Sequence, residues 1–155
     1  MSWTNLEGKV VIITGGAAGI GLAVAQGFVE VGAKVMIADF AEDAGQKAAE
    51  EVSQKGSGEA AFARCDVSSK ADVDAVVART IEKWGTVDAL VNNAGINIPR
   101  LLVDPAGKEE LTEDVWDKVF AVNVKGQFLF AQAVARVFFQ QSKPGVLINM
   151  SSESG

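Results

Sequence analysis

A glycine-rich segment contains the residues best suited to bind phosphate. Thr14-Gly15-Gly16-Ala17-Ala18-Gly19-Ile20-Gly21 lies between an apolar run of strand length and a segment of helical period. Glycines allow the backbone to turn tightly, and free amides at a helix start offer a pyrophosphate hydrogen-bond donors and a partial positive charge. The segment departs from the usual G-x-G-x-x-G spacing, and a tight turn without a ligand is the alternative. Its position between a strand and a helix favours phosphate binding by the amides of Gly15 to Gly21.

A single carboxylate follows the second apolar run. Asp39 lies at the carboxyl end of that run, where the adenosine ribose of a dinucleotide would bind. A carboxylate there accepts hydrogen bonds from the ribose hydroxyls and repels a 2′-phosphate. The neighbouring Phe40 and Ala18 are uncharged at positions where an NADP site would use Arg or Lys. The pattern predicts NAD as the cofactor; the alternative role for Asp39 is an N-cap for a helix that begins near Glu42.

Two kinds of segment alternate along the chain and must position these residues. Apolar runs of strand length occupy residues 9–14, 34–39, 59–65, 87–92 and 145–150. Most are apolar at consecutive positions, which is typical of parallel strands that are covered on both faces. Segments with helical period occupy residues 20–31, 42–55, 69–84 and 112–140. Ser69 and Thr112 are the predicted N-caps of the last two, and Gly32, Gly56 and Gly85 end the first three.

This alternation predicts an α/β fold, a parallel sheet with helices on both faces. Together with the motifs for dinucleotide binding, it leads us to expect a Rossmann-type, doubly wound sheet with the strand order of that fold, 3-2-1-4-5. All 155 residues are expected to form a single dinucleotide-binding domain. The long irregular stretch 93–111 is the candidate for a segment that faces the substrate, because long loops in compact domains are usually functional.

Charge and composition exclude several classes of function. The chain has 14 basic and 20 acidic residues and a net charge of −6. This balance, without a basic run, argues against nucleic acid or an anionic membrane surface as partner. Cys65 is the only cysteine and histidine is absent, so no disulfide within the chain, no Cys/His metal site and no histidine base can form. We expect a cytoplasmic protein that acts on a small molecule, with neither a membrane span nor a secretion signal.

At this point the residues resemble a known family, the classical short-chain dehydrogenases/reductases. Thr14 to Gly21 resembles the family's cofactor loop T-G-x-x-x-G-x-G, and Asp66-Val67 its adenine-contacting pair. Asn92-Asn93-Ala94-Gly95 matches the motif N-N-A-G. Asn123 matches the catalytic asparagine, and Ser152 aligns with the catalytic serine. Taken singly, these residues could equally be turn, cap or loop residues. Their common order and spacing make the resemblance strong.

The resemblance implies an oxidoreductase that transfers hydride between NAD(H) and a carbonyl/alcohol substrate. It implies cofactor contacts along the glycine-rich loop, at the end of the second and third strands and in the N-N-A-G motif. These candidate cofactor residues are Gly15, Ala17, Ala18, Gly19, Ile20, Gly21, Asp39, Phe40, Asp66, Val67, Asn93, Ala94 and Gly95. The implied catalytic residues in this chain are Asn123 and Ser152. Family members also commonly associate, so a homotetramer or homodimer is expected.

A narrower resemblance within the family concerns the substrate. The segments Gly95-Ile-Asn-Ile-Pro-Arg-Leu-Leu-Val-Asp104 and Ile148-Asn-Met-Ser-Ser-Glu153 are similar to those of sorbitol-6-phosphate 2-dehydrogenases. This similarity implies a sugar alcohol or sugar phosphate as substrate, with Asn97, Arg100 and Glu153 as candidate contacts. Arginine suits phosphate because its planar fork can donate two parallel hydrogen bonds. A solvated loop arginine is the alternative for Arg100.

The chain departs from the family in one respect. The family's proton relay uses Asn, Ser, Tyr and Lys, whereas this sequence contains no tyrosine. A tyrosine of ordinary pKa near 10 would need a neighbouring cation to act at neutral pH, and nothing here replaces it. We therefore expect the chain to be the N-terminal part of a family member, ending before a Tyr-x-x-x-Lys region and leaving the fifth strand as an apolar edge. The alternatives are a catalytically inert dinucleotide-binding fragment and a scaffold that does not use the ligand.

Overall fold

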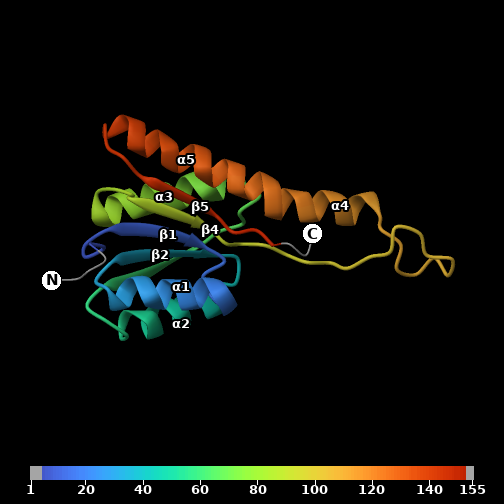
Figure 1. Ribbon diagram of the computed structural model, residues 1–155, viewed down its shortest axis with the longest axis horizontal. Coiled ribbons are helices and arrows are strands. Elements are labelled where there is room, and N and C mark those ends of the chain that lie inside the picture. Colours follow the sequence, from blue (N-terminus) through green and yellow to red (C-terminus); the bar gives the residue numbers. More distant parts are fainter. Residues whose placement is uncertain (1–4, 153–155) are drawn as a thin grey trace.

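The computed structural model describes residues 5–152 of the chain, in which five strands alternate with helices (Figure 1). The strands are β1 (Val10–Thr14), β2 (Lys34–Asp39), β3 (Glu59–Arg64), β4 (Ala89–Asn92) and β5 (Val146–Asn149). The helices are α1 (Gly19–Glu30), α2 (Glu42–Ser53), α3 (Lys70–Trp84), α4 (Glu113–Phe120) and α5 (Gly126–Gln140), with the π-helical segment η1 (Ala121–Lys125) between the last two.

The strands form one parallel sheet in the order β3-β2-β1-β4-β5, which confirms the predicted topology. In the centre, Ile12 of β1 lies opposite Met36 of β2 and Leu90 of β4. The chain winds outward from β1 in both directions, so the segments that follow β1 and β4 lead to helices on opposite faces of the sheet, and ligands bind at this point in such folds.

Each face of the sheet has its own apolar core. Val11 and Ile13 of β1 pack in a cluster with Ala25 and Val29 of α1 and with residues of α2. Ile12, between them in sequence, packs in a second cluster with residues of α3 and α5. Figure 1 shows α1 and α2 on one face and α3 and α5 on the other. This double burial explains why the strands are apolar at consecutive positions.

The helix termini follow the predicted capping residues. Ser69 accepts a hydrogen bond from the Asp72 N–H at the start of α3, and Thr112 accepts one from the Val115 N–H at the start of α4. Gly85 ends α3 in the left-handed conformation, with φ of 81°. Each cap satisfies a backbone group that the helix itself leaves unpaired.

The helical region 112–140 differs from the single regular helix predicted from sequence. A five-residue π-helical segment, η1, separates α4 from α5. π-helical turns are rare and occur frequently at functional sites. Hydrophobic periodicity predicts the helix but not this local change of winding, which places Asn123 in an irregular part of the backbone.

Two further regions matter for the site and the surface. The segment 93–112 contains an isolated bridge between Leu101 and Glu110 and extends away from the sheet together with α4 (Figure 1). Strand β5 pairs with β4 at the edge of the described sheet, and all four of its residues are exposed, as expected for an apolar edge strand. Among residues 5–152, no helix combines the length and the apolar character that crossing a bilayer requires.

Candidate functional site

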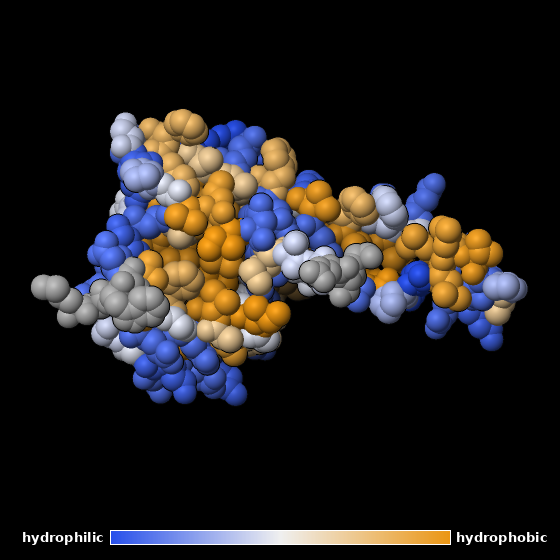
Figure 2. Space-filling model, in the orientation of Figure 1, coloured by the Kyte–Doolittle hydropathy of each residue, from blue (hydrophilic) through white to orange (hydrophobic). Residues whose placement is uncertain are grey.

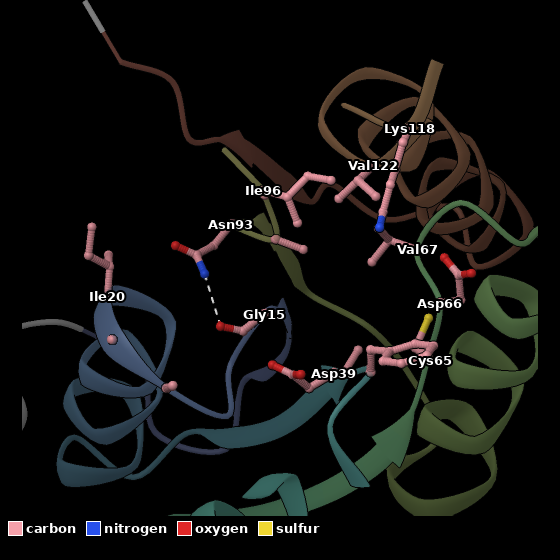
Figure 3. A pocket seen from close by; sticks show the side chains of 16 residues that line it. Gly15, Ile20, Asp39, Cys65, Asp66, Val67, Asn93, Ile96, Lys118 and Val122 are labelled. Atoms are coloured by element: carbon pink, nitrogen blue, oxygen red, sulfur yellow. Dashed lines mark hydrogen bonds between the residues drawn. The ribbon is translucent and has the colours of Figure 1, made fainter. Parts of the chain in front are cut away.

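A pocket of about 720 Å³ lies at the carboxyl ends of the central strands. It receives residues from the glycine-rich loop, from the ends of β2, β3 and β4, and from the helical region after Thr112 (Figure 3). The lining residues are Gly15, Ala18, Gly19, Ile20, Ala38, Asp39, Phe40, Cys65, Asp66, Val67, Asn93, Ala94, Gly95, Ile96, Lys118 and Val122. The pocket therefore brings together most of the residues that the sequence predicts for cofactor binding.

The glycine-rich loop is packed too tightly for side chains at two positions. A Cβ on Gly15, whose φ is 64°, would lie 2.8 Å from the Ala94 Cα. A Cβ on Gly21 would lie 2.1 Å from the Gly15 carbonyl oxygen. Gly21 itself is buried in α1 and does not line the pocket; its role is to let the helix start approach the loop.

The start of α1 is suited to an anion. Ala18 is the N-cap and makes no side-chain capping hydrogen bond, and the first turn contains no acidic residue. Ala18, Gly19 and Ile20 line the pocket. A helix N-terminus without a capping side chain presents its N–H groups and the positive end of its dipole to the pocket. The N–H groups of this helix start are therefore suited to bind a pyrophosphate group.

Asp39 connects the end of β2 to the glycine-rich loop. Its Oδ2 accepts a hydrogen bond from the Ala17 N–H at 3.0 Å, and its Oδ1 accepts one from the Ala41 N–H at 3.0 Å. Ala17 does not line the pocket; it contributes through this bond. The N-cap of α2 is Ala41, so the alternative that Asp39 caps this helix is wrong. The carboxylate instead closes a local turn ahead of the helix.

One wall of the pocket consists of the three residues that follow β3, Cys65, Asp66 and Val67. The Asp66 carboxylate accepts hydrogen bonds from the Ser68 N–H at 2.9 Å and the Ser68 hydroxyl at 2.7 Å. Burial raises the pKa of the Cys65 thiol to about 12, and the neighbouring carboxylates of Asp72 and Asp66 act in the same direction. Cys65 is therefore a neutral, unreactive part of the wall at neutral pH.

The Asn93 side chain links β4 to the glycine-rich loop. Its Nδ2 donates to the Thr14 and Gly15 carbonyl oxygens, each at 3.1 Å, and Figure 3 shows the bond to Gly15. The Thr14 hydroxyl oxygen accepts from the N–H groups of Asn93 and Ala94, each at 3.0 Å. These bonds join the carboxyl ends of β1 and β4, so the pocket has a fixed floor between them.

Asn123 acts on the pocket through another residue. Its Oδ1 accepts from the Ile96 N–H at 2.8 Å and its Nδ2 donates to the Ile96 carbonyl at 2.9 Å. Ile96 lines the pocket, whereas Asn123 does not. The amide thus holds the segment after β4 against the helical region. Ser152 follows β5, is exposed and lies outside the lining residues.

Of the three candidate substrate residues, the two that the structure describes do not line the pocket. Asn97 and Arg100 are exposed and are not among its lining residues. The Arg100 Nη1 donates to the Pro99 carbonyl at 2.8 Å. Glu153 lies outside the described residues. The resemblance of segment 95–104 to sorbitol-6-phosphate 2-dehydrogenases implied these contacts, whereas the segment after β4 extends away from the sheet (Figure 1).

Sequence reasoning missed five lining residues, Ala38, Cys65, Ile96, Lys118 and Val122. Figure 3 shows the Lys118 ammonium group pointing into the pocket near Val67 and Val122. Lys118 and Val122 are four residues apart and so share one side of a helix. Their spacing just before Asn123 was the available signal, but which side faces the pocket depends on how the helix packs.

The fold and the arrangement of the pocket define a Rossmann-type α/β protein. The family model described as short chain dehydrogenase matches residues 9–155, and the chain belongs to this family. It is 41% identical over 157 residues to a sorbitol-6-phosphate 2-dehydrogenase of Klebsiella pneumoniae, covering 99% of this chain and 55% of that protein. It is 41% identical over 152 residues to a sorbitol dehydrogenase of Cereibacter sphaeroides, covering 97% and 55%.

This chain is also similar to a solved structure of a short chain dehydrogenase. The crystal structure of a short chain dehydrogenase from Mycobacterium smegmatis superposes with a TM-score of 0.84 at 34% identity, over 92% of this chain and 57% of that one. The chain thus spans little more than half the length of these three proteins.

Proposed function

We propose that this chain binds NAD(H) in the pocket and serves hydride transfer between NAD(H) and a carbonyl/alcohol substrate. The observation that carries the proposal is the convergence of the uncapped start of α1 and the Asp39 carboxylate on one pocket. Family membership supports a cofactor of the NAD(P) class. NAD rather than NADP follows from Asp39, because its carboxylate favours ribose hydroxyls and repels a 2′-phosphate.

Each lining group has a role in this proposal. The amides at the start of α1 hold the pyrophosphate, Asp39 holds the adenosine ribose, and Asp66 and Val67 contact the adenine. Asn93 to Gly95 line the path toward the nicotinamide. Bound NAD supplies the hydride acceptor, and the protein supplies binding and orientation.

The catalytic side of the proposal rests on Asn123 and Ser152. Ser152 would present its hydroxyl to the substrate oxygen, while Asn123 fixes Ile96 at the pocket. Since the chain contains no tyrosine, these residues do not include the tyrosine that the family uses as acid/base. That observation favours a second candidate function, dinucleotide binding without catalysis.

We propose a sugar alcohol or sugar phosphate as the substrate. The support is the likeness to proteins named sorbitol-6-phosphate 2-dehydrogenase and sorbitol dehydrogenase. If Arg100 binds a substrate phosphate, Arg100→Ala would weaken activity on sorbitol 6-phosphate and leave activity on sorbitol unchanged. An equal effect on both substrates would remove this role.

Calorimetric titration of the purified protein with NADH and NADPH tests cofactor binding, and NADH formation with sorbitol or sorbitol 6-phosphate tests turnover. We expect tighter binding of NADH than of NADPH. NADH binding without turnover would support the second candidate, and absence of NADH binding would overturn both. Where turnover is found, Ser152→Ala should reduce it with NADH affinity nearly unchanged; unaltered turnover would exclude the serine.

The proposal extends to assembly and location. Exposed apolar residues on the helical region, Trp116, Phe120 and Phe128, support a homodimer or homotetramer, and Figure 2 shows apolar surface along the part of the molecule that projects from the sheet. Sedimentation equilibrium would test this, since a monomer at micromolar concentration would contradict it. The free, buried Cys65 is consistent with a reducing, cytoplasmic environment.

A further inference from the structure

An exposed aromatic residue beside the ribose carboxylate is held by a cation. Phe40 directly follows β2, is 64% exposed and lines the pocket. The guanidinium carbon of Arg64, the last residue of β3, lies over the Phe40 ring, 4.8 Å from its centroid. The parallel register places Arg64 opposite Asp39. Pairing of β2 with β3 therefore brings the cation to the ring at the carboxyl edge of the sheet.

Asp72 on α3 holds the other side of this cation. Its Oδ2 lies 3.7 Å from the Arg64 Nη1, and the same oxygen accepts the Asp66 N–H at 2.9 Å. Hydrogen bonds from the Asp66 N–H and the Ser69 side chain hold the pKa of Asp72 below its ordinary value. One charged carboxylate thus anchors both Arg64 and the backbone at Asp66.

The contacts of Arg64 and Asp72 connect residues that line the same part of the pocket. Phe40, fixed through Arg64, and Asp66 with Val67 all line the same pocket. A phenyl ring that contacts only solvent rotates freely about its side-chain bonds. A ring that packs against a guanidinium group is restrained. A flat aromatic ring presented to a pocket is suited to pack against a purine base, because every base offers a π-face.

We propose that Arg64 is a positioning residue that holds the Phe40 ring as a wall for the purine base of the dinucleotide. This inference rests on the proposed function, because it assigns the adenine end of the same pocket. Arg64 acts through Phe40 and does not itself contact the base. The competing role for an arginine at this edge is direct binding of a 2′-phosphate, and the ligands chosen below separate the two.

The test compares Arg64→Met with the wild-type protein by calorimetry against ADP-ribose, ADP, 2′,5′-ADP and nicotinamide mononucleotide. We expect Arg64→Met to weaken ADP and ADP-ribose about 2- to 5-fold, the effect of a cation on an exposed ring. Binding of nicotinamide mononucleotide, which lacks the purine, should not change. Arg64→Lys should recover part of the loss, since an ammonium group can also lie over the ring.

A double-mutant cycle isolates the contact between Arg64 and Phe40. Phe40→Leu should weaken the adenine ligands at least as much as Arg64→Met, and adding Arg64→Met to Phe40→Leu should cause no further loss. Arg79→Met is the matched control, because Arg79 is exposed on α3 and does not line the pocket. Thermal melting checks that each variant folds; if Arg64→Met unfolds, Arg64→Gln, which also removes the cation, replaces it in the cycle.

The outcomes are separable. Wild-type protein that fails to bind ADP-ribose overturns the proposed function and this inference with it. Wild-type binding with unchanged affinity in Arg64→Met overturns the inference alone, as does additivity in the cycle. Weakened binding of 2′,5′-ADP with unchanged binding of ADP would identify Arg64 as a phosphate-binding residue instead.

Discussion

The Asp39 carboxylate accepts a hydrogen bond from the Ala17 N–H at 3.0 Å, across 22 positions of sequence. The residue expected to bind the ribose therefore also fixes the glycine-rich loop. A substitution at Asp39 changes two parts of the site together, and only the comparison of two cofactors separates them. NADH and NADPH share the pyrophosphate but differ at the adenosine ribose, which we propose Asp39 binds.

We predict that Asp39→Ala weakens NADH about 10- to 100-fold, the loss expected for hydrogen bonds to a charged group. NADPH should lose less, because removal of the carboxylate also removes repulsion of the 2′-phosphate. Fluorescence titration with both cofactors measures the difference, with Glu42→Ala as the control at a neighbouring exposed acid. Equal losses for the two cofactors would mean that Asp39 only supports the loop.

Gly21 and Gly27 offer a matched pair within α1. A Cβ at Gly21 would lie 2.1 Å from the Gly15 oxygen, whereas a Cβ at Gly27 would meet nothing within 4 Å. We predict that Gly21→Ala costs about 1–3 kcal/mol of unfolding free energy and weakens NADH. Gly27→Ala should stabilise the protein by about 0.4–1 kcal/mol. Urea unfolding and NADH titration test both, and similar behaviour of the two variants would contradict the tight packing of the loop.

Asn123→Ala removes both hydrogen bonds to the Ile96 backbone. We predict a loss of about 1–3 kcal/mol of unfolding free energy, because two partly buried backbone groups lose their partner. NADH should also bind more weakly, since Ile96 lines the pocket. The control is Asn97→Ala, at an exposed position outside the pocket lining. Wild-type stability of Asn123→Ala in urea would show that the segment after β4 is held by other contacts.

Asp88 predicts a dependence of stability on acid pH. Burial alone would raise its pKa, but hydrogen bonds from the Val10 N–H and the Lys143 ammonium, at 2.8 and 2.9 Å, hold the pKa below its ordinary value of 3.8. Because the folded-state pKa is the lower one, this stabilisation is present above about pH 4 and is lost as the pH falls through the folded-state value.

In Asp88→Asn this part of the acid dependence should disappear, together with about 1.5–3 kcal/mol of unfolding free energy at pH 7. Urea unfolding between pH 3 and pH 7 measures both effects. Asp43→Asn is the control at an exposed acid on α2. An identical pH profile for Asp88→Asn and wild type would show that Asp88 does not cause the acid dependence of stability.

The Cys65 thiol should resist modification in the folded protein. Its pKa of about 12 leaves almost no thiolate at pH 8, and the residue is 1% exposed. We predict slow reaction with Ellman's reagent in buffer and fast reaction in urea. A raised folded-state pKa also means that stability is retained below about pH 9 and declines as the pH rises toward 12. Fast labelling of the native protein would contradict the burial.

The sequence by itself determined where the five strands and the glycine-rich loop lie along the chain. Strands buried on both faces need consecutive apolar residues, and a glycine-rich turn between strand and helix has a local steric cause. Both signals depend only on residues that are close together in the sequence. For this reason the five strands and the loop from Gly15 to Gly21 follow from the printed residues alone.

Only the tertiary structure decided which distant residues meet. The π-helical turn at Asn123, the bond of Asn123 to Ile96 and the entry of Lys118 into the pocket depend on how the helical region packs on the sheet. The same holds for Arg64 over Phe40, which strand pairing brings together. These contacts join residues that are separated in sequence, and their geometry is set by the balance of packing across the whole sheet rather than by any local pattern.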